Sequence, residues 1–401
     1  MTSHKMLRVF CRIFVLAAFL FSLGLYAQDM GAAQISQASG DVAIFNLQGM
    51  ARGGLVGQAV RPDEVVETGP KGKATLLFDD GSKIEMGPNT RLKIDDQVTT
   101  GTTSVFLFLG RIFARIVPLK TEEPAFSVQT LSSTAGVRGT DFEVAAGMDG
   151  GSLVSVEHGD VEVVSDGSTA PLALKAGEEA NATFDGKLAR DKRAERKDEE
   201  WNKWLAARQD FFAKNPTQVV NMLLRRIERN RILIAEQDKK MGEQNRVIAV
   251  YYQQGKLTPE QVREQVSKEI DVYMRLMNRL SRADNNLVGV NYILSHANEM
   301  IMLSPNAYTP EFRDQVGAAR KKLDALDVAK IHKQDKQLIA VHFARVMKAA
   351  KKWNLQDEVW KDLPPKARER VIKKWQEQEA LEQQQQQPKP KPGPKQQQNI
   401  K

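Results

Sequence analysis

The chain has 401 residues, with 58 Lys and Arg against 50 Asp and Glu, and a single cysteine. Hydrophobic residues make up 41% and charged residues 27%, close to the averages of globular proteins, which excludes a wholly disordered chain. No run of about 18 apolar residues follows the first 30 positions, which excludes a polytopic membrane protein. The one cysteine, Cys11, cannot form an intrachain disulfide.

Residues 1–27 have the pattern of a secretory signal peptide. Three basic residues lie within the first 12 positions, an apolar stretch follows over residues 13–25, and the small Ala27 ends it. At 1.5 Å per residue this stretch covers about 20 Å, less than the ~30 Å of a hydrocarbon core. We therefore expect cleavage near Ala27 and export to the periplasm or cell surface of a bacterium, with an uncleaved anchor as the alternative.

The remaining chain divides into two parts with opposite composition. Residues 28–190 hold 21 of the 27 glycines and carry 14 basic against 22 acidic residues, a net charge of −8. Residues 191–401 hold all five tryptophans and carry 41 basic against 28 acidic residues, a net charge of +13. We place the boundary in the charged stretch Arg190 to Glu200, between a first domain over 28–190 and a second over 191–382.

The first domain is predicted to be all-β. Ala74, Leu76 and Phe78 alternate with their neighbours at period two, as in a strand with one buried face. Asp-Gly pairs at 80–81, 149–150 and 166–167 are typical of hairpin turns. Many short strands at intervals of about 8–12 residues fit a sandwich, a barrel or a short solenoid-like stack, and the sequence leaves these open.

The second domain is predicted to be all-α. Thr258 opens a capping box with proline at the first helical position, and Thr309 precedes another proline in the same way. Breaks at Gly255, Pro305 and Pro364 separate three long helical stretches and a shorter fourth. Short connections favour antiparallel neighbours, so we expect a helical bundle or extended helical hairpins.

A motif over residues 134–144, TAGVRGTDFEV, resembles the signature of the FecR domain family. The resemblance runs from about residue 60 to 165 and implies an all-β domain on the envelope side of the membrane, with a binding or structural role rather than a reaction. Further segments match the family pattern in the same order, at residues 65–72, 86–90, 109–111 and 154–163.

The best understood FecR-like proteins are transmembrane transducers that sense an outer-membrane transporter and control an anti-sigma segment. This sequence departs from them, because its N-terminal segment has the pattern of a signal peptide. We therefore expect a non-enzymatic envelope protein, with the β-domain for partner recognition and the helical domain as a spacer or assembly element. The alternative is a periplasmic regulatory component that acts with a separate membrane partner. A third hypothesis, an enzyme, would need a pocket with converging polar groups.

Within the family motif, Arg138, Thr140 and Asp141 are the candidate contacts for a protein partner. The structural alternative is that Arg138 pairs with an acid of the same strand, Asp141 or Glu143. The sequence has no hydrolase, zinc-protease or phosphate-loop motif, and neither His158 nor a pair of ligands on one helix makes a metal site. We therefore predict no catalytic residue, no cofactor and no metal.

Four arginines on the first long helix, Arg225, Arg226, Arg229 and Arg231, are candidate contacts for an anion such as a lipid headgroup or a cell-wall polymer. The alternative is a solvated face balanced by neighbouring glutamates. Nucleic acid is not expected as a partner of an exported protein.

The charge difference between the domains predicts that they dock together or that the helical domain recruits an outside anion. We favour the outside anion, because the Gln-, Pro- and Lys-rich tail over 383–401 is expected to be an extended, mobile arm. The oligomeric state stays open.

Overall fold

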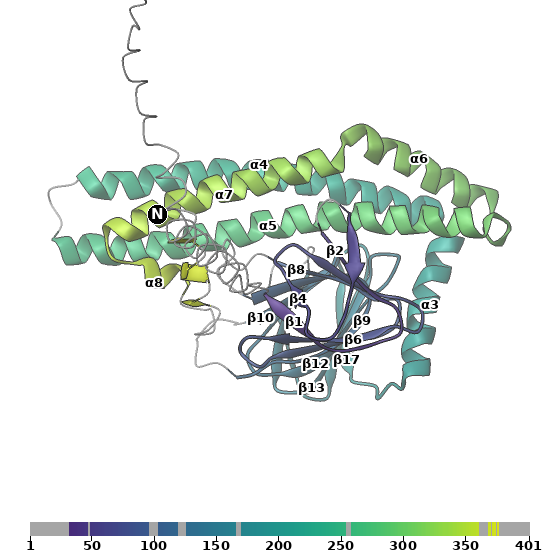
Figure 1. Cartoon of the computed structure of the whole chain (residues 1–401). Coiled ribbons are helices and arrows are strands. Elements are labelled where there is room, and N and C mark those ends of the chain that lie inside the picture. Colours follow the sequence, from purple (N-terminus) through teal and green to yellow (C-terminus); the bar gives the residue numbers. More distant parts are fainter. Residues whose placement is uncertain are drawn as a thin grey trace, which may run out of the picture.

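The computed structural model describes residues 32–46, 49–95, 103–118, 126–165, 170–253, 258–360, 368–369, 371–373 and 375–376. Strands occupy residues 33–192, here called the β part, and helices occupy residues 198–359, the helical part. Figure 1 shows the long helices lying across the β part. The predicted order of a β region followed by an α region is therefore confirmed.

The last strand ends at Lys192 and the first helix begins at Asp198. Whether each part folds alone stays a prediction. The predicted signal peptide over 1–27 and the tail over 383–401 lie outside the described residues. None of the described helices is both long and apolar enough to cross a membrane.

Within its described residues the β part has seventeen strands in two sheets that share one strand, β9. Sheet A has the order β4-β1-β6-β7-β9-β12-β13-β16-β17, and sheet B has the order β3-β2-β5-β8-β9-β10-β11-β14-β15. All these pairs are antiparallel except β9 with β10. The strands are β1 Ala33–Ser39, β2 Val42–Phe45, β3 Ala51–Gly53, β4 Ala59–Val60, β5 Val65–Thr68, β6 Lys73–Phe78, β7 Lys83–Met86, β8 Arg91–Ile94, β9 Thr103–Arg115, β10 Phe126–Gln129, β11 Ser133–Val137, β12 Asp141–Ala146, β13 Ser152–His158, β14 Asp160–Ser165, β15 Leu172–Lys175, β16 Glu178–Ala182 and β17 Leu188–Lys192.

The two sheets enclose one apolar core. The alternation predicted for Ala74, Leu76 and Phe78 places all three side chains in this core, together with Ile44 and Val66 from sheet B. Of the arrangements that the sequence left open, the chain therefore adopts the sandwich. Alternation has this result because successive side chains of a strand point to opposite faces of the sheet.

Strand β9 passes from one sheet to the other at Gly110. Its backbone there has φ +98°, and a Cβ atom would lie 2.5 Å from the Cα of Thr90. Only glycine combines this positive φ with such a close approach of two backbones. The residues before Gly110 pair with β8 and β10 of sheet B, and those after it pair with β7 and β12 of sheet A.

The helical part contains α3 Asp198–Lys214, α4 Pro216–Gln253, α5 Pro259–Leu303, the short 3-10 turn η1 Pro305–Ala307, α6 Pro310–Leu326, α7 Val328–Lys352 and α8 Gln356–Val359. The predicted caps are confirmed, since the hydroxyls of Thr258 and Thr309 accept hydrogen bonds from Gln261 and Phe312. The stretch after Thr309 differs from our expectation of one helix, because it breaks at Asp327. That residue is left-handed, at φ 50°, and its carboxylate caps α7 by accepting from the Lys330 N–H at 3.1 Å.

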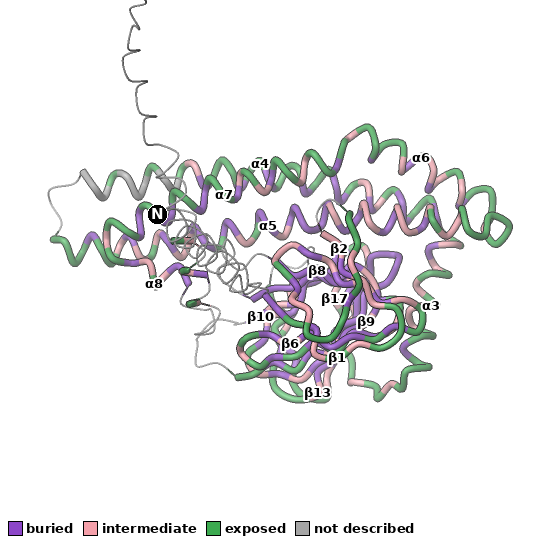
Figure 2. Tube along the Cα trace, viewed as in Figure 1, coloured by how far each residue is buried: buried purple, intermediate pink, exposed green. Residues whose placement is uncertain are grey.

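Helix α5 is about 68 Å long at 1.5 Å per residue. It lies between the β part and the outer helices α4, α6 and α7 (Figure 1). Figure 2 shows its side toward the β part as buried and the outer helices as exposed on their far side. The contact is apolar at its centre, because Phe106 and Phe108 of β9 belong to the same buried cluster as Leu223 of α4 and Val290 of α5. The two parts are therefore docked on each other.

Helix α5 approaches the β part closely at Gly289. A Cβ atom there would lie 3.1 Å from side-chain atoms of Phe106 and Leu131. We expect Gly289→Leu to lower the free energy of unfolding by about 1–3 kcal/mol, because added atoms overpack the contact. Gly317 of α6 has open space around its Cβ position, so Gly317→Leu is the matched control and should stabilise by up to about 1 kcal/mol. Urea denaturation measures both, and equal effects of the two substitutions would contradict the prediction.

Candidate functional site

Helix α3 covers one half of the outer face of sheet A. Trp201 is 1% exposed and packs on Ala145 of β12 and Leu153 of β13. Its ring lies under two guanidinium groups, 5.5 Å from that of Arg111 and 5.1 Å from that of Arg196. These contacts fix α3 through an aromatic anchor and cation–π attraction.

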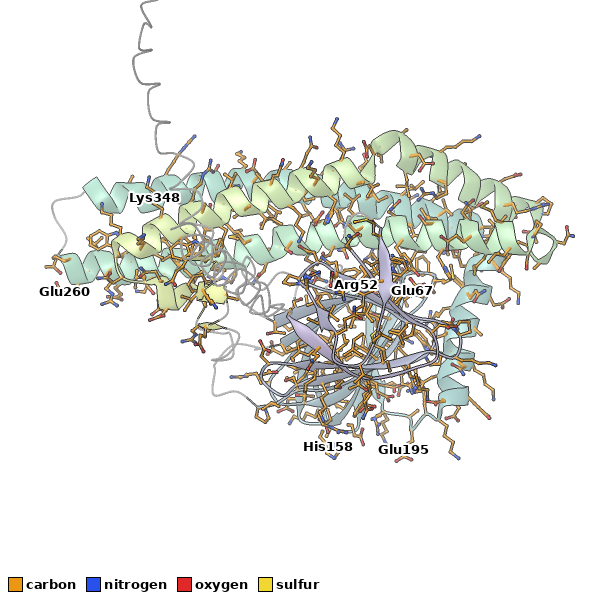
Figure 3. The ribbon with its side chains drawn as sticks, viewed as in Figure 1. Arg52, Glu67, His158, Glu195, Glu260 and Lys348 are labelled. Carbon is orange, nitrogen blue, oxygen red and sulfur yellow. The ribbon has the colours of Figure 1, made fainter. Side chains whose placement is uncertain are left out.

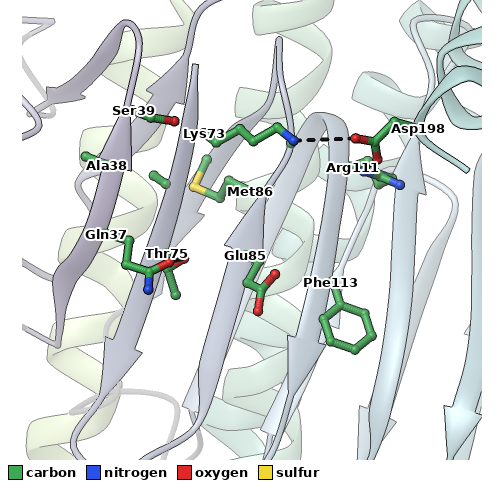
Figure 4. A pocket seen from close by; sticks show the side chains of 12 residues that line it. Gln37, Ala38, Ser39, Lys73, Thr75, Glu85, Met86, Arg111, Phe113 and Asp198 are labelled. Atoms are coloured by element: carbon green, nitrogen blue, oxygen red, sulfur yellow. Dashed lines mark hydrogen bonds and ion pairs between the residues drawn. The ribbon is translucent and has the colours of Figure 1, made fainter. Parts of the chain in front are cut away.

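The other half of this face stays open and forms a groove with a volume of about 470 Å³. Strands β1, β6, β7 and β9 supply its floor, and the first turn of α3 closes one end (Figure 4). The lining residues are Gln37, Ala38, Ser39, Lys73, Ala74, Thr75, Glu85, Met86, Gly87, Arg111, Phe113 and Asp198.

An ion-pair network holds the closed end of the groove. Asp198 lies 2.6 Å from Nη2 of Arg111 and 3.4 Å from Nζ of Lys73. The hydrogen bond from Arg111, followed by the charges of Arg111 and Lys73, keeps the pKa of Asp198 below its usual value. Glu143 lies 3.6 Å from Arg111 on the other side, and burial raises its pKa despite that neighbour. Arg111 is thus held between two carboxylates, and its charge faces the groove already oriented.

The rest of the groove is a mixed surface. Phe113 is half-buried and follows Arg111 on the same side of β9, because alternate residues share a face. Gln37 accepts a hydrogen bond from the Thr75 hydroxyl at 3.4 Å, and Glu85 is exposed. Figure 4 shows these side chains along neighbouring strands. An aromatic side, amide groups and paired charges are features that suit an extended protein segment.

The predicted partner contacts do not line this groove, and they differ in exposure. Asp141 lies 3.4 Å from Arg115, which is two residues beyond Phe113 on β9. Arg138 is exposed in the turn before β12. Thr140 is only 1% exposed, and its hydroxyl donates to the Asp160 carbonyl at 2.9 Å, so its role here is to hold the turn.

The four arginines of α4 do not share one face. Arg226 is 5% exposed and donates to the carbonyl of Phe184 in the β part at 3.0 Å. Arg225, Arg229 and Arg231 are exposed. Helical geometry explains this division, since Arg226 follows Val219 and Leu223 on the side that faces the β part.

Sequence reasoning did not single out Lys73, Arg111, Phe113 or Asp198 as a site. The alternation of Arg111, Phe113 and Arg115 with buried residues was a usable signal, because it places three large side chains on the outer face of one strand. The position of Asp198 had no such signal. It depends on α3 folding back over sheet A.

Two hydrogen-bonded groups have residue types that occur in catalysis. In one, Nδ1 of His342 lies 2.8 Å from the Tyr273 hydroxyl and its Nε2 lies 2.7 Å from Asp238. Both His342 and Tyr273 are fully buried among the helices, where they join α4, α5 and α7. In the other, Nδ1 of His332 lies 2.8 Å from Asp284. Among the described residues, no group of three or more His, Cys, Asp or Glu side chains could hold a metal ion.

Residues 64–162 match the family model described as FecR protein, so the chain carries a FecR domain where its motifs predicted one. Two crystal structures of a protein named as a candidate anti-sigma factor from Parabacteroides distasonis are each 21% identical, with a TM-score of 0.30. Each similarity covers 34% of this chain, and 63% and 64% of the other chains, which is less than two thirds of their length. A cell surface anchoring domain is 25% identical over 17% of this chain and 88% of its own, with a TM-score of 0.16. No curated protein matches the chain.

The Asp198 contact predicts a pH-dependent contribution to stability. Because its folded-state pKa is lowered, the contribution is present above the ordinary value of 3.8 and is lost as the pH falls through the folded pKa. Asp198→Asn should lower the free energy of unfolding by less than about 1 kcal/mol at pH 7, since the carboxylate is exposed, and by a smaller amount at pH 3. Glu199→Gln, which changes the neighbouring acid of the same helical turn, is the control. A loss for Asp198→Asn that is as large at pH 3 as at pH 7 would refute the assignment.

Proposed function

We propose that this chain is a non-enzymatic protein of the bacterial cell envelope whose FecR-like β part recognises a protein partner. The helical part acts as a spacer or assembly element. The observation that carries this proposal is the open half of sheet A, where a groove with an oriented Arg111 lies beside the aromatic Phe113. Four of the strands that bound or flank this groove, β6, β7, β9 and β12, lie within the region that matches the family.

The groove suits a segment of another protein. The side chains at one end of the groove are charged and already held by ion pairs. Little side-chain freedom would therefore be lost on binding. Arg and aromatic residues are the types that most often dominate protein interfaces. Arg138 and Asp141 would extend the contact beyond Arg115 along the edge of the same face.

A second form of this function is a periplasmic regulatory component that acts with a separate membrane partner. The FecR match favours it, because the motifs resemble those of a family whose best understood members transmit signals. The groove would then be the surface that the membrane partner occupies. Both forms place recognition on the same residues, so one experiment tests them together.

Site-specific photo-crosslinking tests the groove. A benzoylphenylalanine at position 113 should capture one envelope protein in living cells, and Lys73→Glu in the same chain should abolish the capture. Lys175→Glu reverses an exposed charge on β15, which belongs to sheet B and not to the groove face, and is the control. The same probe at the exposed Val341 of α7 should not capture that protein. Capture that is equal at positions 113 and 341, or insensitive to Lys73→Glu, would reject the groove as the recognition surface.

The helical part supports a second candidate, which is binding to an anionic surface. Helix α7 has seven basic residues and one acid, Asp335, which is 7% exposed. Lys333, Arg345 and Lys348 are exposed at spacings that place them along one side of the helix (Figure 3 labels Lys348). This helix carries a more one-sided charge than α4, where glutamates accompany the arginines we predicted as anion contacts. The surface we favour is an anionic lipid headgroup layer.

Sedimentation of the full chain with anionic liposomes tests this candidate. Binding is expected at low salt and should fall as salt rises, because the Debye length over which charges attract shortens to about 3 Å at 1 M. Reversal of Lys333, Arg345 and Lys348 to glutamate should abolish it, whereas reversal of Arg190 and Lys192 on β17 should not. Binding to isolated cell wall but not to liposomes would move the assignment to a polymer. An absence of binding to both at low salt would eliminate the candidate.

A further inference from the structure

The helical part contains two apolar cores with a buried polar belt between them. One core surrounds Tyr273 and Phe343, and the other surrounds Leu223 and Val290. The polar belt consists of the buried Ser281, Asp284, Asn285 and Asn286 on α5 and Asp335 on α7, with the half-buried His332 and Lys336 of α7 and the exposed Arg231 of α4 at its rim. Buried polar groups cost stability unless they find partners, so the partners of this belt define what it does.

The polar belt is joined to the β part by direct contacts. The Asn285 amide donates to both carboxylate oxygens of Asp95 at 3.0 and 3.1 Å. Lys93 of β8 lies 2.8 Å from Asp95 and 3.3 Å from Asp63. Lys336 of α7 lies 2.7 Å from that same Asp63. One chain of polar contacts thus runs from α5 through the β part to α7.

Lys93 and Asp63, the members of this series of contacts that lie in the β part, keep a fixed charge. Burial alone would lower the pKa of Lys93, but the charges of Asp95, Asp63 and Asp284 outweigh it and hold that pKa above its usual value. Burial alone would raise the pKa of Asp63, but Lys93 and Lys336 hold it well below its usual value. These groups therefore stay charged at every pH near neutrality.

Asp335 is different, because no ion pair among the described residues reaches its carboxylate. Its Oδ2 atom is buried without a hydrogen-bond partner among the described residues. Three charged or titratable groups face it: Asp284 on α5, His332 on its own helix and Arg231 on α4. Burial, and then the charge of Asp284, raise its pKa to about 7, although His332 and Arg231 act in the opposite direction.

We propose that Asp335 makes the seating of α7 at the polar belt sensitive to pH: when it is protonated α7 packs fully against α5, and when it is ionised this contact opens. Opening at this point also weakens the Lys336 contact to Asp63, which is where α7 holds the β part. The sign follows from linkage. Because the folded-state pKa lies above the ordinary value of 3.8, the closed contact is favoured on the acidic side and loses this advantage as the pH rises to about 7.

Hydrogen exchange of the full chain tests the proposal by comparing wild type with Asp335→Asn at the same pH, so that the intrinsic exchange rate cancels. At pH 4, close to the ordinary pKa of 3.8, the segments over 281–286 and 331–336 should exchange at rates within about threefold of each other in the two proteins. At pH 8 these segments should exchange at least about tenfold faster in the wild type than in Asp335→Asn, since one pKa unit corresponds to a tenfold change in equilibrium. Asp314→Asn, an exposed acid of α6, is the control and should equal the wild type at both values.

A second variant, at the surface, keeps the proposal testable if Asp335→Asn does not fold. Arg231 is exposed and lowers the folded-state pKa of Asp335, so Arg231→Gln should raise the pH at which the faster exchange reaches its plateau. Arg225→Gln on the same helix should leave that pH unchanged. A ratio of exchange rates that is the same at pH 4 and pH 8 would overturn the proposal. So would a pH effect spread evenly over all helices, because it would report global stability rather than a local contact.

Discussion

Strand β9 determines how the other parts of this molecule meet. Its side chains face three surroundings: Val105 and Leu107 enter the sandwich core, Phe106 and Phe108 contact the helices, and Arg111 and Phe113 face the groove. One strand can do this because it crosses from sheet B to sheet A. The outer face of its first half and the outer face of its second half therefore lie on opposite sides of the sandwich. The close approach of Gly110 to Thr90 makes the crossing possible. A change of register in β9 would move the helical contact and the groove together.

The contact between the two parts combines apolar packing with a few buried charges. The apolar centre around Phe106 supplies the larger stabilisation, because area removed from water contributes roughly 25 cal/mol per Å². The charged group around Lys93 contributes less net energy, since two carboxylates must first offset the cost of burying its ammonium group. Its contacts nevertheless join three elements, because Asp63 and Asp95 contact Lys93 of β8, Lys336 of α7 and Asn285 of α5. Apolar packing therefore supplies most of the stabilisation, and the polar contacts add direction to it.

Features that depend on local sequence could be predicted. The alternation around Leu76, the capping box at Thr258 and the order of the two regions are all determined within a few residues. The FecR match over 64–162 was also visible, because its motifs are local. The break at Asp327 was missed, because the apolar pattern continues across it and only the left-handed backbone interrupts the helix.

The site depends on long-range contacts, and these could not be predicted. Arg111 and Asp198 are far apart in the sequence and meet only because Trp201 anchors α3 on sheet A. The same limit applied to the arginines of α4. Their sequence indicated one basic cluster, but the position of the β part decides that Arg226 turns inward to Phe184. The two parts are docked, which was the alternative to the outside anion that we favoured. The apolar surfaces around Phe106 bring the parts together whatever their net charges, so this docking does not depend on the charge difference.

The position of the polar belt follows from where the helices leave the β part. On one side of it, α4, α5 and α6 are supported by sheet B through Phe106 and Phe108. On the other side, the core around Tyr273 and Trp360 is made by helical residues alone, and Figure 1 shows this end projecting beyond the sandwich. Helices α4, α5 and α7 run unbroken through the belt and join the two ends. Because buried polar side chains interrupt the apolar core at Asp284 and Asp335, the packing between these helices depends at this point on hydrogen bonds and charges, whose strength responds to pH and salt in a way that apolar packing does not.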